Sequence, residues 1–320
     1  MSLMFDDTPD IDDVIERLND DDAEVRSIAV MDLREFDDEE SIPLSVKALK
    51  DLDAGVRVEA AQVMDEFTGV EVAKALVEAL SDSDEDVRKA AALTMAENKN
   101  DEGGEIFLEG IKNESPFVKS SCLCALRALR IPESKGVALE CLQHGDANVR
   151  REAVGVLAYL KNDDVLIALM NAARKDQDEN VRRVAMGSLV FSKNEKTAEA
   201  LIDGLKDENW RVREESAFVI GKVKQDSAID ALIDAMNDEY WQVRVKAASS
   251  LGKLKNPNAV DVLGQALSYN ISNLRKEAAS ALGQIKSKNA LPFLNAAKDD
   301  VDPDVRKVAE WAIDQINNSN

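Results

Sequence analysis

The residues of this sequence that best suit chemistry are three cysteines and one histidine, Cys122, Cys124, Cys141 and His144. Thiolate and imidazole groups are ligands that zinc prefers, so a mononuclear metal site is the first possibility to weigh. His144 is the only histidine, and no nucleophile with a neighbouring base can be recognised, so hydrolytic catalysis lacks its usual groups. Whether the four side chains can converge depends on the elements that carry them.

A valine-arginine pair recurs ten times along the chain, 31 residues apart except for one step of 32. A fixed period of this size indicates a solenoid, in which each repeat contacts mainly its neighbours. The ten copies, some with a related residue in one place, are Val25-Arg26, Val56-Arg57, Val87-Arg88, Val118-Lys119, Val149-Arg150, Val181-Arg182, Val212-Arg213, Val243-Arg244, Leu274-Arg275 and Val305-Arg306.

The eighth repeat shows most clearly what each copy folds into. Apolar residues at helical spacing predict a first helix over 228–236 and, after a turn, a second helix over 243–254. Two such helices cannot cover their own apolar faces, so they must stack on the next hairpin. We therefore expect an all-α fold, a single α-solenoid of about ten two-helix repeats over residues 8–317. Residues 1–7 are expected to form a flexible tail and residues 318–320 a short one.

The register of the repeat places two of the cysteines at packing positions. Cys141 aligns with Gly204 and Ala235, where the two helices of a hairpin pack tightly, and Cys122 aligns with Ala247 on the apolar face. Small buried hydrophobic residues explain both cysteines without a metal. We therefore expect neither a metal site nor a cofactor.

The turn between the two helices carries further recurring residues. A polar residue such as Asp53 or Ser115 stands three positions before the valine and is expected to cap the second helix. An aspartate usually stands five positions before the valine, and stacking should bring it near an arginine of a neighbouring repeat. A ladder of such pairs would mainly fix the stacking register, so we interpret these arginines as structural. The predicted ladder includes Asp82, Arg88, Asp207, Arg213, Asp238 and Arg244.

The motif Asp…Val-Arg-x-x-Ala-Ala-x-x-Leu-Gly, seen from Val243 to Gly252, resembles HEAT repeats. It is most similar to the short subtype first described in phycobilisome lyases, and the resemblance covers residues 8–317. The early repeats depart from the motif, for example around Met64 and Glu66. The resemblance implies that the second helices line a concave surface, which varies between repeats.

Two kinds of enzyme with similar repeats indicate which catalysis to look for. Deoxyhypusine hydroxylase holds two irons with His-Glu pairs, whereas this chain has one histidine, and Gly145 follows it. That activity is therefore excluded. Bilin lyases are the other catalytic relatives, and the resemblance implies attachment or removal of a tetrapyrrole, largely as a chaperone for the chromophore. A lyase-like protein of this kind is the alternative to a non-catalytic one.

The net charge of −22 is concentrated at the N-terminal end, where residues 1–40 hold 16 acidic and 3 basic side chains. An acidic field repels phosphate backbones, so a nucleic-acid partner is not expected. The acidic end is either a solubilising cap or a docking surface for a basic partner. Neither a signal peptide nor a membrane-spanning stretch can be recognised. Three cysteines are too few for a disulfide scaffold, so we expect a protein of the reducing cytoplasm. We also expect a monomer or a weak homo-oligomer.

The helical wheel gives the candidate binding surface. Positions −2, −1, +2, +3, +6 and +10 from the valine point away from the packed side of the second helix. Seven of the 14 aromatic residues, with every tryptophan, occupy such positions. Because packed helices lie about 8–10 Å apart, those of repeats four to eight would form one broken stripe. The predicted partner-binding residues are Phe117, Tyr159, Phe191, Trp210, Arg211, Phe218, Trp241 and Trp311.

Basic residues lie on or beside the same face, namely Arg151, Arg183, Arg211, Lys222, Lys246 and Lys253. We therefore expect a non-catalytic scaffold or adaptor that binds an apolar and acidic segment of another protein or peptide in this groove. The competing interpretation is that the rings fold back over neighbouring turns and that Trp311 seals the last repeat. Replacing Trp210 and Trp241 together by alanine should weaken a complex by at least about tenfold if the groove binds it.

Overall fold

The computed structural model describes residues 10–97, 101–160, 162–192 and 196–318, and within these ranges the protein is all-α, with no strand. In these described residues, twenty α-helices form ten hairpins, which confirms the predicted α-solenoid of two-helix repeats. The chain divides into two compact units, which we call the N-terminal half (1–160) and the C-terminal half (161–320).

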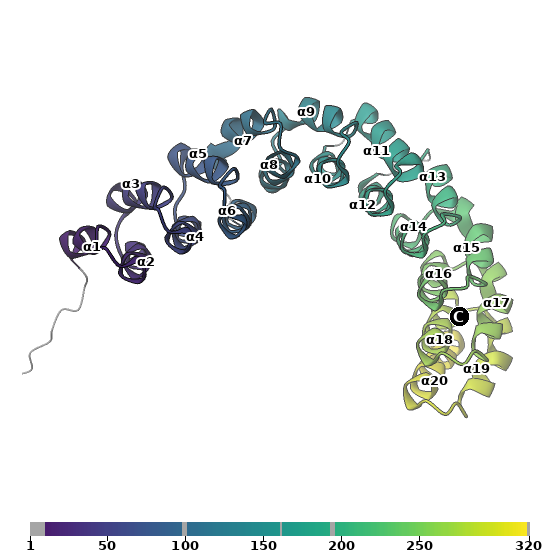
Figure 1. The fold of residues 1–320 in the computed structure, drawn as a ribbon. Helices are drawn as coiled ribbons and strands as arrows, with labels where there is room; N and C mark the ends of the chain where they lie inside the picture. The colour runs from purple at the N-terminus through teal and green to yellow at the C-terminus, as the bar shows by residue number, and fades with distance from the viewer. Residues whose placement is uncertain (1–9, 98–100, 161, 193–195, 319–320) are drawn as a thin grey trace, which may run out of the picture. The chain divides into compact units, whose positions relative to one another are not determined.

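The N-terminal half contains five hairpins, in which the odd-numbered helices form one layer and the even-numbered helices the other (Figure 1). Its α-helices are α1 (Ile11–Arg17), α2 (Ala23–Asp32), α3 (Asp38–Ala48), α4 (Ala54–Val63), α5 (Val70–Ala79), α6 (Glu85–Glu97), α7 (Gly104–Gly110), α8 (Pro116–Leu129), α9 (Ser134–Cys141) and α10 (Ala147–Leu157). Short 3-10 turns lie at η1 (Leu33–Glu35), η2 (Met64–Glu66) and η3 (Asp101–Gly103).

The C-terminal half repeats the same two-layer arrangement in five further hairpins (Figure 1). Its α-helices are α11 (Asp163–Lys175), α12 (Glu179–Ser188), α13 (Thr197–Gly204), α14 (Trp210–Val223), α15 (Ile229–Ala235), α16 (Trp241–Leu254), α17 (Val260–Ala266), α18 (Ser272–Ile285), α19 (Leu291–Ala297) and α20 (Pro303–Asn317). Its 3-10 turns are η4 (Leu189–Phe191), η5 (Asp226–Ala228), η6 (Pro257–Ala259) and η7 (Lys288–Ala290).

Small polar residues cap most of the even-numbered helices, as the sequence predicts, whereas Tyr240 and Ile271 take the N-cap positions of α16 and α18. The carboxylate of Asp53 accepts the N–H groups of Gly55 and Val56, at 2.8 and 3.4 Å, which satisfies donors that the first helical turn leaves open. Ser115 is the N-cap residue of α8, but its hydroxyl makes no capping hydrogen bond. At the other end, α14 and α16 stop at Lys224 and Lys255, both in the left-handed conformation with φ 57°.

The core of each half lies between its two layers and between successive even-numbered helices. The anchor valines Val212 and Val243 are fully buried. Small residues let the second helices approach closely, because a side chain on Gly221 of α14 would overlap Ser250 of α16. The Ser250 hydroxyl donates to the carbonyl oxygen of Ala217 at 2.6 Å, so the serine also joins one repeat to the next.

The predicted N-terminal tail, residues 1–7, lies outside the described residues, and so do Ser319 and Asn320 of the C-terminal tail. The remaining tail residue, Asn318, is the C-cap of α20. That residues 8–317 form one continuous solenoid stays a prediction, since each half is described by itself. None of the helices in the described residues is long and apolar enough to span a lipid bilayer.

Candidate functional site

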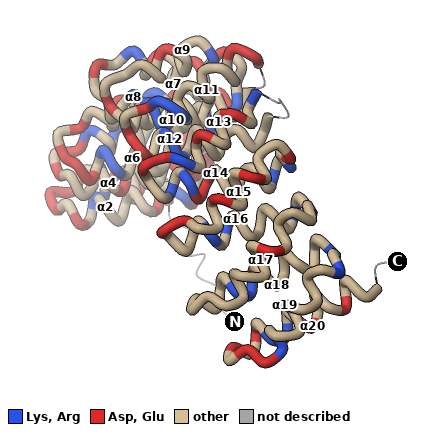
Figure 2. Tube along the Cα trace, turned by 90° about the vertical axis from the view of Figure 1, so that its right-hand side faces the viewer, with Lys and Arg blue, Asp and Glu red and all other residues tan. Residues whose placement is uncertain are grey.

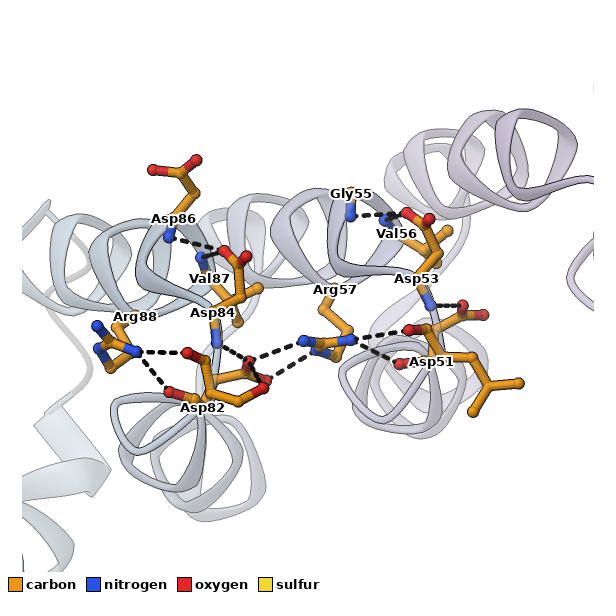
Figure 3. A network of polar contacts seen from close by, with 12 residues as sticks. Asp51, Asp53, Gly55, Val56, Arg57, Asp82, Asp84, Asp86, Val87 and Arg88 are labelled. Atoms are coloured by element: carbon orange, nitrogen blue, oxygen red, sulfur yellow. Dashed lines mark hydrogen bonds and ion pairs between the residues drawn. The ribbon is translucent and has the colours of Figure 1, made fainter.

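Arginine side chains join the turns of successive repeats (Figure 3). Nε and Nη2 of Arg57 donate to the two carboxylate oxygens of Asp82, each at 2.8 Å. Nη1 of the same arginine donates to the carbonyl oxygens of Asp51 and Leu52 in its own turn, at 2.9 and 3.3 Å. The same paired contact, always with the residue 25 positions later, joins Arg26 to Asp51, Arg182 to Asp207, Arg213 to Asp238 and Arg275 to Asp300.

The contact changes where the next turn lacks an aspartate. Arg88 donates to the carbonyl oxygens of Asp82 and Ser83, at 2.7 and 3.0 Å, but Asn113 stands where other repeats have the carboxylate. Arg244 instead lies over the ring of Tyr269, 5.2 Å from its centroid. Among the predicted ladder residues, the structure thus pairs the three aspartates with arginines, while Arg88 and Arg244 make other contacts.

The arginines also set the acidity of the aspartates that they contact. The hydrogen bond from Arg57 lowers the pKa of Asp82, although burial acts in the opposite direction. In the same way the hydrogen bond from Arg275 lowers the pKa of Asp300. The Arg57 and Asp82 side chains are only 12% and 14% exposed, so their attraction is less screened than that of an open surface pair. This edge is therefore a structural connection between repeats.

The cysteines lie in packing positions. Cys122 is fully buried, and its sulfur lies where a side chain on Gly110 of α7 would be. Burial raises the pKa of the Cys122 thiol to about 12, and burial also raises the pKa of Cys124 and of Cys141. Protonated thiols are poor metal ligands. No group of three histidine, cysteine or acidic side chains in the described part of the chain is placed to hold a metal ion.

His144 has a role in a turn. Its Nδ1 accepts the N–H of Asp146 at 3.0 Å. In most other turns an aspartate oxygen accepts the equivalent N–H, as when Asp82 accepts from Asp84 at 2.8 Å. The histidine therefore replaces the aspartate of the repeat in this backbone contact.

The two predicted binding residues of the N-terminal half lie in separate environments. Phe117, on the first turn of α8, is 38% exposed and lines a pocket of about 650 Å³ together with Leu93 of α6 and Arg151 of α10. Tyr159, just after α10, lies under the guanidinium of Arg130, which is 4.2 Å from the ring centroid.

In the C-terminal half, one group of aromatic residues lies at the N-terminal ends of the even-numbered helices. Trp210 of α14 stacks on Tyr240 of the next turn, with ring centroids 5.4 Å apart and an interplanar angle of 12°. The guanidinium of Arg211 lies over the Trp210 ring, 4.7 Å from its centroid. Trp241, the first residue of α16, is 38% exposed. Trp210 therefore folds over a neighbouring turn, and Trp241 remains open to solvent.

A second group lies further along the same helices. The ring of Phe218 in α14 has three lysine ammonium groups around it: Lys222 at 5.5 Å, Lys246 at 5.7 Å and Lys253 at 5.6 Å from the centroid. Burial, followed by repulsion from Lys222, lowers the pKa of Lys253. Burial also raises the pKa of Glu215, one turn before Phe218 on α14. We call Phe218 and these three lysines the lysine cluster.

The two remaining predicted binding residues, Phe191 and Trp311, are both partly exposed. Phe191 ends η4 and is 49% exposed. Trp311 of α20 lies against Gly283 of α18, where a side chain on the glycine would overlap the indole, yet 42% of the tryptophan stays exposed. Trp311 thus covers part of its neighbouring helix and still presents a face to solvent.

Sequence reasoning missed two residues of these surfaces. Tyr240 takes the N-cap position of α16, where most repeats have a small polar residue, and that aromatic exception could have indicated the stack with Trp210. Leu93 is 63% exposed at the same offset from its valine as Phe218. Counting exposed aliphatic residues with the aromatic ones would have found it.

Charge is divided unequally between the two halves (Figure 2). The N-terminal half has 37 acidic and 17 basic residues, a net charge of −20, whereas the C-terminal half has 25 and 23, a net charge of −2. The lysine cluster therefore lies in the half that is nearly neutral, where a local group of positive charges is not outweighed.

Comparisons with known proteins agree with this architecture. The family model for HEAT repeats matches residues 11–96, 73–157, 104–190, 136–221, 167–241, 198–267 and 229–314. None of the curated proteins matches the chain.

Among solved structures, an engineered protein is 19% identical with a TM-score of 0.52, and the match covers 98% of this chain and 100% of that one. A chain from the complex of Kap95p with RanGDP is 14% identical with a TM-score of 0.65, and one from the Kap95:Nup1 complex is 13% identical with the same score. Both matches cover 96% of this chain but 50% of the other, so the chain spans about half the length of these relatives. Identities this low show a shared fold alone.

Proposed function

The chain belongs to the HEAT-repeat family, and on that premise we propose that it is a non-catalytic scaffold that binds another protein or peptide. The binding surface is the solvent-facing side of the even-numbered helices in the C-terminal half, together with η4, which follows α12. The observation that carries the proposal is the exposure there of large aromatic side chains, with Trp241 at 38%, Trp311 at 42% and Phe191 at 49%. Tryptophan is the residue most enriched at the centres of protein interfaces.

The properties of the fold support a binding role. Stacked repeats present an extended surface whose residues can vary while the packed side stays constant. The matched structures include Kap95p bound to RanGDP and the Kap95:Nup1 complex, so proteins with a similar fold do bind other proteins. The chemistry of the partner of this chain is therefore inferred from the surface of this chain, and not from the partners of those proteins.

The finer predictions made from the sequence belong to the same proposal. We propose a protein that acts in the cytoplasm as a monomer or weak homo-oligomer, without a nucleic-acid partner or a cofactor. The phycobilisome-lyase subtype stays a prediction, and with it the lyase-like alternative. An absorbance band that appears on mixing the purified chain with free bilin would favour that alternative.

A pulldown with the full chain tests the scaffold, followed by a binding measurement with the purified partner. We expect one stoichiometric protein, and we expect the double replacement Phe191→Ala with Trp241→Ala to weaken its binding by at least about tenfold. Val301→Ala is the matched control, because Val301 is 90% exposed and lies in the turn before α20, outside the even-numbered helices. Unchanged affinity in the double variant, with helicity intact by circular dichroism, would overturn the proposed surface.

A further inference from the structure

The lysine cluster stands out because three ammonium groups surround one aromatic ring. Acidic residues outnumber basic ones by 62 to 40, and some exposed lysines pair with them, as Lys89 does with Glu85 at 2.7 Å. Within the described residues, Lys222, Lys246 and Lys253 make no ion pair with a carboxylate. Three like charges have instead been gathered around one ring.

The geometry brings these charges together from two helices. Lys222 extends from α14, four residues after Phe218, and Lys246 and Lys253 extend from α16. All three Nζ atoms lie between 5.5 and 5.7 Å from the centroid of the Phe218 ring. The ring attracts each ammonium group weakly, since cation–π contacts at partly exposed sites contribute only about 0.5–1 kcal/mol. The mutual repulsion of the three lysines is therefore only partly offset.

Burial and repulsion between the lysines both act on the charge of the cluster. The pKa of Lys253 is lowered by its burial and by repulsion from Lys222 and Lys246, although Glu277 acts in the opposite direction. The other nearby acid, Glu215, has a raised pKa because it is buried. Neither glutamate forms an ion pair with the lysines in the described residues, although Glu277 interacts electrostatically with Lys253 and Glu215 with Lys246. Three lysines against two glutamates leave an excess of formal positive charge.

We propose that the lysine cluster is a docking site for an acidic peptide segment of the partner, with Asp or Glu carboxylates placed between the three ammonium groups of Lys222, Lys246 and Lys253. The inference rests on the proposed function, because it names the chemistry of the partner on the same surface. Apolar side chains between the carboxylates lie along Phe218. Carboxylates would relieve the repulsion among the lysines, which favours binding specifically at this point of the surface.

The net charge of the chain also makes a second copy a poorer occupant than a peptide. The acidic N-terminal half of one copy would have to bind the lysine cluster of another copy. Two copies with a charge of −22 each repel one another, however. A short acidic segment meets less of that repulsion than a whole second chain does. The cluster therefore fits a peptide better than a homo-oligomer.

The test uses the purified full chain and a short fluorescein-labelled peptide of repeating Asp-Glu-Leu triplets, with fluorescence anisotropy as the readout. We expect the acidic peptide to bind, an Asn-Gln-Leu version to bind at least about tenfold more weakly, and added salt to weaken the acidic complex. Replacing Lys222, Lys246 and Lys253 together by glutamine should weaken binding by at least about tenfold. Replacing the same three by arginine should retain it, because the charge is kept.

The matched control changes the net charge equally at another place. Lys206, Lys288 and Lys298 are exposed lysines of the C-terminal half outside the cluster, and their joint replacement by glutamine should change the affinity less than about twofold. Equal losses of peptide affinity in both triple variants would mean that the peptide responds only to the overall charge of the protein. That result would overturn the docking site. A single-stranded oligonucleotide of equal charge that binds as tightly as the acidic peptide would overturn the assignment of a peptide.

The outcome also separates this inference from the proposed function. If the captured partner binds normally to the glutamine triple variant but loses affinity with Trp241→Ala, the scaffold stands and the acidic docking site is wrong. If the acidic peptide binds as expected but no partner depends on the aromatic residues, the lysine cluster stands and the proposed scaffold surface is wrong.

Discussion

Arg57 and Asp82 lie in consecutive repeats, and their side chains meet through two hydrogen bonds of 2.8 Å each. The same guanidinium donates to two carbonyl oxygens of its own turn, so one side chain joins two hairpins. Arg88, one repeat later, makes the same kind of bonds to its own turn but has Asn113 in place of the next aspartate. The chain therefore contains a complete contact and an incomplete one at equivalent positions.

This pair of arginines allows the contribution of the carboxylate to be measured. Arg57→Met should lower the free energy of unfolding by about 1–2 kcal/mol more than Arg88→Met, because it also leaves the poorly exposed Asp82 carboxylate without its guanidinium. Chemical denaturation of both variants checks this. Equal losses would show that the carbonyl contacts, and not the carboxylate, stabilise the edge.

The incomplete contact can be completed by one substitution. Asn113 already accepts the N–H of Ser115 at 2.8 Å, as the aspartates of other turns accept theirs. Asn113→Asp would place a carboxylate 25 residues after Arg88, the same separation as between Arg57 and Asp82 or Arg275 and Asp300. We expect stability to rise by up to about 1 kcal/mol, with a smaller gain at high salt. The same substitution combined with Arg88→Met should give no gain, and a gain there would contradict the pairing.

The aspartates of these contacts make stability depend on pH. The pKa values of Asp51, Asp82 and Asp300 are lowered in the folded protein, chiefly by hydrogen bonds from Arg26, Arg57 and Arg275. A lowered pKa means that the unfolded chain binds protons more readily, so the stabilisation is complete above the unfolded value of about 4. It is lost as the pH falls through the lower, folded value.

The denaturation midpoint should therefore fall steeply below about pH 4, and Asp82→Asn should reduce that dependence. The difference in stability between the wild type and Asp82→Asn should shrink as the pH is lowered from 7 to 3, since protonation removes the charge from the wild type as well. Urea denaturation at a series of pH values measures it. A constant difference over that range would contradict the role of the ionised carboxylate.

The period of the sequence was enough to predict the hairpins and the faces of their helices. Val243 and its equivalents recur at one spacing, and the register of any residue follows from its offset to that anchor. The pairing of Arg213 with Asp238 depends only on this spacing and on stacking. Such features repeat, and a repeated feature can be predicted from a single chain because each copy supports the others.

What a helical wheel cannot give is the height of a residue along its helix or its contact with the next repeat. Trp210 and Phe218 share one face of α14 but are separated by eight residues, or about 12 Å along the axis. The wheel places both in one stripe, whereas the structure places them in two groups with different neighbours. The stack of Trp210 on Tyr240 joins two turns that the sequence separates by about one repeat, and its one sequence signal is the aromatic residue at the N-cap of α16.

The two tryptophans at the start of α14 and α16 should therefore differ in what they contribute. Trp210 is stacked on Tyr240 and covered by Arg211, so Trp210→Ala should lower the free energy of unfolding by about 1–2 kcal/mol. Trp241→Ala should lower the free energy of unfolding by less than Trp210→Ala does, because 38% of the Trp241 residue is exposed.

Under the proposed function, the order is reversed for binding: Trp241→Ala should weaken the complex by at least about tenfold, and Trp210→Ala by less. Denaturation and affinity measurements on the same two variants check both orders. Tyr240→Phe, which keeps the stacked ring, should leave both quantities nearly unchanged, and a large effect there would contradict the importance of the stack.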